Sequence, residues 1–204
     1  VVTHFNHEIT SMKSFLAEDF DAVFVGTGAP RGRDLELPGR EEVSEHISIG
    51  IDWLSSVAFA HTDRIEGKVI VMGGGNTAMD CCRTAKRLGA ESVTVVVRSA
   101  FEVMKASEWV KEDAMSEGIP IINNRPPKEF VHEDGKLKGV LFECVKPVEG
   151  DDGRLSYVPS GEPDVFMEAD HILMAIGQEN HCPWIERDVD IEFDKWDCPI
   201  LDED

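Results

Sequence analysis

Apolar positions in this chain gather in short runs, which charged or glycine-rich segments separate. The runs at residues 69–72 and 92–97 have the length and composition of strands. The segment between them, up to about residue 88, has the character of a helix. A strand, a helix and a second strand within about 30 residues predict a βαβ unit.

The same kind of pattern continues on both sides of this unit. It predicts a buried strand at 21–26, helices at 51–59 and 107–117, a short strand at 119–122, an antiparallel hairpin of 128–132 with 137–145, and a strand within 165–176. The hairpin is expected because Glu133-Asp134-Gly135-Lys136 is a turn signal. We therefore expect an α/β chain of three layers, in which a small antiparallel sheet covers a parallel sheet.

A glycine-rich turn, Gly73-Gly74-Gly75, follows the first strand of the βαβ unit. With Ala78 it forms the pattern G-x-G-x-x-A, in which Gly73 makes the tight turn and Gly75 leaves room for a diphosphate. The N–H groups at the start of the next helix then face the anion. A purely steric glycine turn is the alternative, but the flanking strand and helix favour a Rossmann-like dinucleotide site. The residues expected at the diphosphate are Gly73, Gly74, Gly75, Asn76 and Thr77.

The end of the second strand indicates which dinucleotide binds. An NAD site usually carries an acidic residue there, whereas this chain has Arg98 followed by Ser99, with Lys105 seven residues beyond Arg98. A guanidinium, a hydroxyl and an ammonium together suit the 2′-phosphate of NADPH. Arg98 could instead be an ordinary solvated charge, and Glu102 lies between the two cations. The pattern favours NADPH over NADH.

Residues 73–90, GGGNTAMDCCRTAKRLGA, closely resemble the NADPH-binding segment of the glutamate synthase small (beta) subunit family. Similar segments occur in dihydropyrimidine dehydrogenase and related flavin oxidoreductases. Residues 20–41 resemble the passage from the FAD part to the NADPH part in this family, and residues 170–178 resemble the strand that returns to the FAD part. The chain departs from the family at Arg98-Ser99, where Arg-Arg is common, and at residues 104–106, where Met-Pro-Ala is common.

The resemblance implies a division of the chain. We expect a partial strip of an FAD domain and a linker at 1–50, the NAD(P)H-binding domain at 51–180, and the start of the return segment at 181–204. In the intact protein, Gly26, Gly28, Ala175 and Gly177 would border the flavin or the nicotinamide. The FAD-binding glycine motif near the start of the family's proteins and the Gly-Asp motif near their end have no counterparts in these 204 residues. We therefore expect FAD in the intact protein only, and a fragment that is inactive alone.

Composition excludes several classes of partner. The net charge is −20, from 40 acidic and 20 basic residues, so that nucleic acids and anionic membranes would repel the chain. No apolar run approaches the roughly 18 residues of a membrane span. The five cysteines have no metal-ligand spacing, which predicts no metal site and reduced thiols in a cytoplasmic protein.

The sequence contains no Ser–His–Asp arrangement, and we expect no catalytic side chain. Hydride transfer from nicotinamide to flavin requires the two rings to be positioned rather than protonated. The sequence therefore predicts an NADPH-binding module of an FAD-dependent oxidoreductase, working with a flavin domain of the same protein and an electron-accepting domain or subunit. One alternative is a non-catalytic nucleotide-binding or regulatory module. Another is a methyltransferase, which would favour an acidic residue where Arg98 stands.

Overall fold

The structure, a computed structural model, describes residues 1–150, 153–195 and 198–200. These residues belong to two compact units, and the larger of them spans residues 32–177. The smaller unit combines residues 1–31 with the described part of 178–204. Residues 32–50 thus fold with the glycine-rich turn, and the assignment of the outer segments to a flavin part stays a prediction.

A parallel sheet forms the centre of the larger unit, with the strand order β2-β11-β3-β4-β5. Its strands are β2 (Ile47–Ile49), β11 (His171–Met174), β3 (Lys68–Met72), β4 (Ser92–Val96) and β5 (Ile121–Ile122). Val71 is paired with Leu173 on one side and with Val95 on the other. The predicted βαβ unit is therefore β3, α3 and β4.

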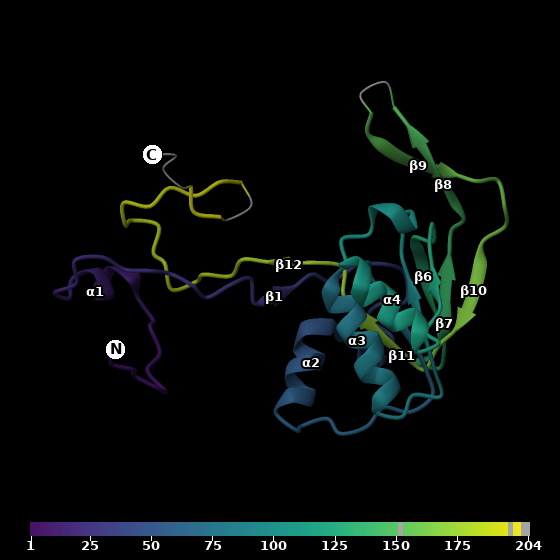
Figure 1. Cartoon of the computed structure of the whole chain (residues 1–204), viewed down its shortest axis with the longest axis horizontal. Helices are drawn as coiled ribbons and strands as arrows, with labels where there is room; N and C mark the ends of the chain where they lie inside the picture. Colours follow the sequence, from purple (N-terminus) through teal and green to yellow (C-terminus); the bar gives the residue numbers. More distant parts are fainter. Residues whose placement is uncertain (151–152, 196–197, 201–204) are drawn as a thin grey trace. The chain divides into compact units, whose positions relative to one another are not determined.

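Helices cover one face of this sheet (Figure 1). They are α2 (Gly50–Ala58), α3 (Asn76–Arg87) and α4 (Glu108–Ser116). Val71 and Val95 point to this side, where they pack with Met79 and Ala85 of α3. Successive residues of a strand face opposite sides of the sheet. The apolar residues next to Val71 and Val95 therefore face away from the helices and must be buried by another layer.

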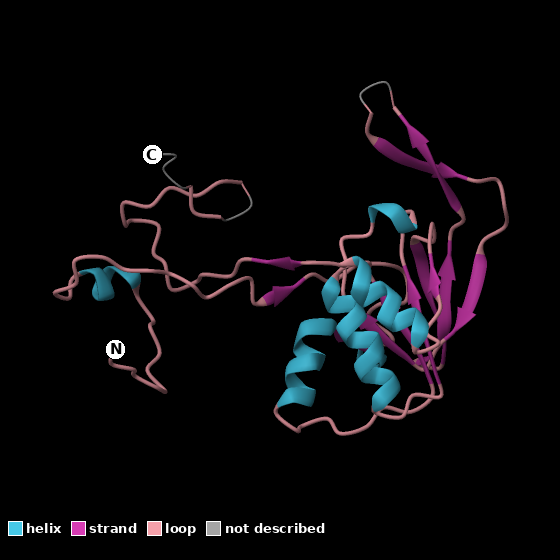
Figure 2. Cartoon of the chain, viewed as in Figure 1, coloured by secondary structure: helices cyan, strands magenta, loops and turns pink. Residues whose placement is uncertain are grey.

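An antiparallel sheet provides that layer, with the strand order β10-β7-β6 (Figure 2). Its strands are β6 (Pro127–Glu133), β7 (Lys136–Phe142) and β10 (Val165–Glu168). Ile70 and Met72 pack against Phe130 and Phe142 in this second core. The three-layer Rossmann-like architecture is confirmed.

The remaining elements are shorter. They comprise α1 (Met12–Leu16), the turns η1 (Ser44–His46) and η2 (Phe101–Val103), a hairpin of β8 (Val145–Glu149) with β9 (Leu155–Pro159), and a pair of β1 (Arg31–Gly32) with β12 (Gln178–Glu179). None of the described helices has the length and apolar character needed to cross a membrane.

Three expectations about local structure were wrong or incomplete. Residues 21–26 form no strand, and the Phe24 side chain is 95% exposed; a buried strand needs neighbours for its backbone hydrogen bonds, and no described strand pairs with this segment. Residues 165–176 hold two strands of different sheets, because the chain leaves the antiparallel layer at Ala169 and enters the parallel one at His171. The β8–β9 hairpin was not predicted.

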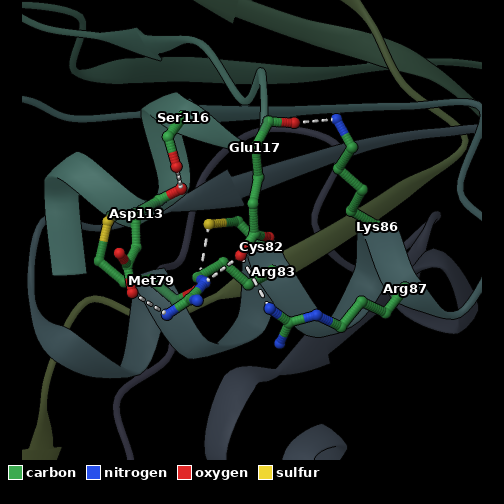
Figure 3. A network of polar contacts seen from close by, with 8 residues as sticks. All are labelled: Met79, Cys82, Arg83, Lys86, Arg87, Asp113, Ser116 and Glu117. Atoms are coloured by element: carbon green, nitrogen blue, oxygen red, sulfur yellow. Dashed lines mark hydrogen bonds and ion pairs between the residues drawn. The ribbon is translucent and has the colours of Figure 1, made fainter.

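Polar contacts fasten α3 to the end of α4 (Figure 3). Glu117 Oε1 accepts hydrogen bonds from Arg83 Nε and Arg87 Nη2, each at 2.8 Å. The backbone oxygen of Glu117 accepts a hydrogen bond from Lys86 Nζ. Arg83 also pairs with Asp113 at 3.1 Å. One exposed pair contributes little, but a shared carboxylate links several cations into a network. This network holds α4 against the helix that begins at the glycine-rich turn.

Candidate dinucleotide-binding site

The candidate site lies at the carboxyl edge of the parallel sheet. Gly73 follows β3, Arg98 follows β4 after one residue, and Ala175 follows β11 directly. Because β3, β4 and β11 run parallel, their carboxyl ends meet at the same edge. Open α/β sheets bind their ligands in this position.

Gly73 and Gly74 are explained by the packing of the protein itself. Gly73 has φ of +136°, and a Cβ there would lie 2.1 Å from the backbone oxygen of Ala175. A Cβ on Gly74 would lie 2.9 Å from Val97 Cγ1 and 3.2 Å from Met104 Cγ. Both positions require glycine whether or not a ligand binds.

Gly75 has no such internal explanation. Its backbone is extended, with φ of −102° and ψ of 177°, which any residue can adopt. A Cβ built on it meets nothing within 4 Å. Gly75 is also the N-cap of the 12-residue helix α3, and it makes no side-chain capping bond. The turn therefore leaves open space in front of a helix N-terminus, where an anion is stabilised by N–H groups and the helix dipole.

Backbone and side-chain hydrogen bonds attach the segment around Lys105 to this turn. Ala106 N donates to Gly74 O at 2.9 Å, and Ser107 N donates to Asn76 Oδ1 at the same distance. Lys105 is exposed beside these bonds. The sequence predicted Asn76 as a diphosphate residue but did not indicate that its side-chain oxygen Oδ1 accepts a hydrogen bond from the segment around Lys105.

The segment after β4 is held in a similar way. Ser99 O accepts from Asn123 Nδ2 at 2.9 Å and from Asn124 N at 3.3 Å. Ala100 N donates to the hydroxyl of Tyr157, which comes from β9, at 3.1 Å. The buried Oδ1 of Asn124 has no hydrogen-bond partner among the described residues. Sequence reasoning missed Asn123, Asn124 and Tyr157, since nothing local distinguishes them from ordinary loop and strand residues.

Arg98 and Lys105 are the cations available to a phosphate here. Both are exposed, and neither makes an ion pair or a side-chain hydrogen bond within the described part of the chain. Thr77 lies in the first turn of α3, next to the open space at Gly75. The structure thus brings the predicted glycines, Asn76, Thr77, Arg98, Ser99 and Lys105 to one edge of the sheet.

Ala175 and Gly177 continue the same edge after β11. Ala175 N donates to Met72 O at 2.7 Å, and Gly177 O accepts from Arg33 N at 3.0 Å. Gly26 and Gly28 belong to the smaller unit, and their role at a cofactor stays a prediction.

The buried thiols of α3 are not poised for redox chemistry. Burial raises the pKa of both Cys81 and Cys82 to about 12, so that neither forms a thiolate near neutral pH. The described His, Cys, Asp and Glu side chains form no group of three or more that could hold a metal ion.

The comparison with protein families agrees with this geometry. The family described as pyridine nucleotide-disulphide oxidoreductase matches residues 6–204. The chain belongs to this family. Among its relatives is the NADPH-Fe(3+) oxidoreductase subunit beta of Geobacter sulfurreducens, which is 33% identical over 190 residues. That alignment covers 91% of this chain but 28% of the relative.

A second relative confirms the expected resemblance. The glutamate synthase [NADPH] small chain of Halomonas elongata is 35% identical over 193 residues, covering 88% of this chain and 40% of that protein. Among solved structures, FprA of Mycobacterium tuberculosis in complex with NADPH has a TM-score of 0.65 at 15% identity, over 89% of this chain and 54% of FprA. This likeness shows the fold.

Proposed function

We propose that this chain is the NADPH-binding module of an FAD-dependent oxidoreductase of the glutamate synthase small-subunit type. The observation that carries the proposal is Gly75, a glycine that neither backbone conformation nor packing requires. A diphosphate at the start of α3 supplies the missing reason, because a side chain at Gly75 would occupy its place. The names of two relatives, which specify NADPH, support the choice of ligand.

The 2′-phosphate of the cofactor would bind between Arg98 and Lys105, with the Ser99 hydroxyl as a neutral donor. The two cations are exposed at the carboxyl edge and have no internal ion-pair partner in the described chain. An arginine fork and a lysine ammonium complement a phosphate dianion. NADH lacks this group and would gain nothing from either cation.

The nicotinamide end would extend toward Ala175 and Gly177, where β11 ends beside Gly73. FAD, when bound in the intact protein, supplies the acceptor of the hydride. The contribution of this chain is to hold the nicotinamide in place, since hydride transfer depends on the distance and stacking of the two rings. A partner domain or subunit would receive the electrons.

The binding step is tested by a graded series at Gly75. Neither Gly75→Ala nor Gly75→Val meets a neighbouring atom at Cβ in the structure, so both variants should keep the unfolding temperature of the wild type. NADPH binding, measured by calorimetry, should weaken with Ala and fall about 100-fold or more with Val, as the side chain enters the diphosphate position. Equal affinities for the wild type and Gly75→Val would overturn the assignment.

The hydride step is tested in the flavin-containing full-length protein. Anaerobic addition of NADPH should bleach the flavin absorbance, and Gly75→Val should prevent it. Bound NADPH without bleaching would favour the alternative of a non-catalytic nucleotide-binding module.

A further inference from the structure

Lys111 is the only buried charged side chain in the part of the chain that the structure describes, with 6% of its surface exposed. It lies on the inner face of α4, whose other buried residues are Val110 and Ala114. Lysines are rarely buried to this extent, and such a side chain packs along its hydrocarbon stem while the ammonium keeps a polar or aromatic contact.

The ammonium of Lys111 contacts an aromatic ring rather than a carboxylate. Lys111 Nζ lies 4.5 Å from the ring centroid of Phe101, a cation–π contact. Within the described residues, Lys111 forms no ion pair, and the nearby acids Glu102, Glu108 and Glu112 are all exposed. The Phe101 ring is therefore the contact within the described residues that orients the Lys111 ammonium.

Phe101 connects Lys111 to the candidate phosphate site. It begins η2, which lies in the chain between Arg98 and Lys105. The same segment is fixed at Ser99 by Asn123 and at Ala100 by Tyr157. The contact of Lys111 with the Phe101 ring is thus a third attachment of the segment after β4, beside those at Ser99 and Ala100.

We propose that Lys111 is a positioning residue for recognition of the 2′-phosphate, an inference that rests on the proposed function. Its ammonium holds Phe101, and with it the backbone that carries Arg98 and Lys105.

Two substitutions separate this role from simple packing. Lys111→Met keeps most of the unbranched chain and removes the charge, whereas Lys111→Arg keeps the charge and the cation–π contact. Calorimetry with NADPH and with NADH, at low and moderate salt, measures the selectivity of each variant, and circular dichroism measures unfolding. A purely structural lysine replaced by methionine in an apolar site leaves stability unchanged or raised, and leaves cofactor selectivity unchanged.

Lys111→Met should weaken NADPH about fivefold or more and NADH less than about twofold, with a smaller salt dependence for NADPH. Lys111→Arg should restore the wild-type preference. If Lys111→Met is folded and keeps the full preference for NADPH, or weakens both cofactors equally, the inference is overturned while the proposed function stands. If Lys111→Met does not fold, Lys111→Arg decides, because a lost NADPH preference in that folded variant overturns the inference. If the wild type binds neither cofactor, the proposed function fails and the inference fails with it.

Discussion

The two ends of the parallel strands differ in how far their polar groups are paired within the described protein. At the amino edge, a cavity of about 560 Å³ is lined by Glu45, His46, Lys68, Lys138, Glu168 and Asp170 among others. Several of these side chains already have partners within the protein. Lys68 pairs with Glu168, and Lys138 pairs with Glu133 at 3.0 Å. His46 Nδ1 lies 3.1 Å from Asp170 O.

The carboxyl edge has more groups without partners among the described residues. Gly75 faces open space, the Asn124 Oδ1 has no partner among the described residues, and Arg98 and Lys105 have no carboxylate within the described chain. Buried polar groups are normally hydrogen-bonded, so, within the described chain, the unpartnered Asn124 Oδ1, together with the exposed and unpaired Arg98 and Lys105, favours this edge as the place of a ligand.

The largest expected effect separates two glycines at the carboxyl edge itself. Gly73→Ala should lower the free energy of unfolding by about 2–4 kcal/mol, because the added Cβ meets the Ala175 backbone and the backbone angle is unfavourable. Gly75→Ala should change it by less than about 0.5 kcal/mol. Urea denaturation of both variants measures the difference, and equal losses would show that Gly75 also serves packing.

The next effect compares one cation from each edge. Arg98→Ala should weaken NADPH about tenfold and leave NADH nearly unchanged, since one charge-assisted contact to the 2′-phosphate is lost. Lys138→Ala, at the amino edge, is the matched control and should alter neither affinity. A loss of NADPH affinity in Lys138→Ala would show that the phosphate binds at the amino edge and not where we propose. An equal loss of affinity for NADPH and NADH in Arg98→Ala would show that Arg98 does not recognise the 2′-phosphate.

The smallest effect concerns pH at the amino edge. Burial lowers the pKa of His171 from its ordinary value of 6.5, and the neighbouring His46 lowers it further. The unfolded chain therefore binds a proton more readily at this position. Protonation of His171 leaves the free energy of unfolding unchanged at alkaline pH and lowers it as pH falls through 6.5. Unfolding measured from pH 8 to pH 5 should show a shallower loss of stability in His171→Gln than in the wild type. NADPH affinity at pH 8 should be the same in both, and a change there would link the two edges.

Local signals were sufficient for the centre of the fold. The apolar run before Gly73 and the helix after it define β3 and α3, because both depend on neighbouring residues. The same reasoning failed at residues 21–26, where an apolar run has no pairing strand within the described chain. It also failed at Ala169, since the pattern of residues 165–176 does not show that one run serves two sheets.

The sequence proposes the chemistry of the candidate site but does not indicate the residues that support it. Gly73, Arg98 and Lys105 belong to patterns that a diphosphate or a phosphate imposes on a short stretch of chain. Tyr157 and Lys111 act on the segment after β4 from 57 residues and 10 residues away in sequence, respectively. Their contacts form only on tertiary folding, and no periodicity in the sequence predicts them.

The position of β11 has a consequence for the order in which the protein is made. This strand lies between β2 and β3, yet it is synthesised about a hundred residues after β3. A nascent chain that has emerged only as far as β10 lacks the strand that joins β2 to the rest of the sheet, and lacks the Ala175 carbonyl against which the Gly73 turn closes. Long-range pairing of this kind is slow to form. The turn at Gly73 is therefore completed only after β11 has emerged, and until then the apolar edges of β2 and β3 are exposed to chaperones and to other chains.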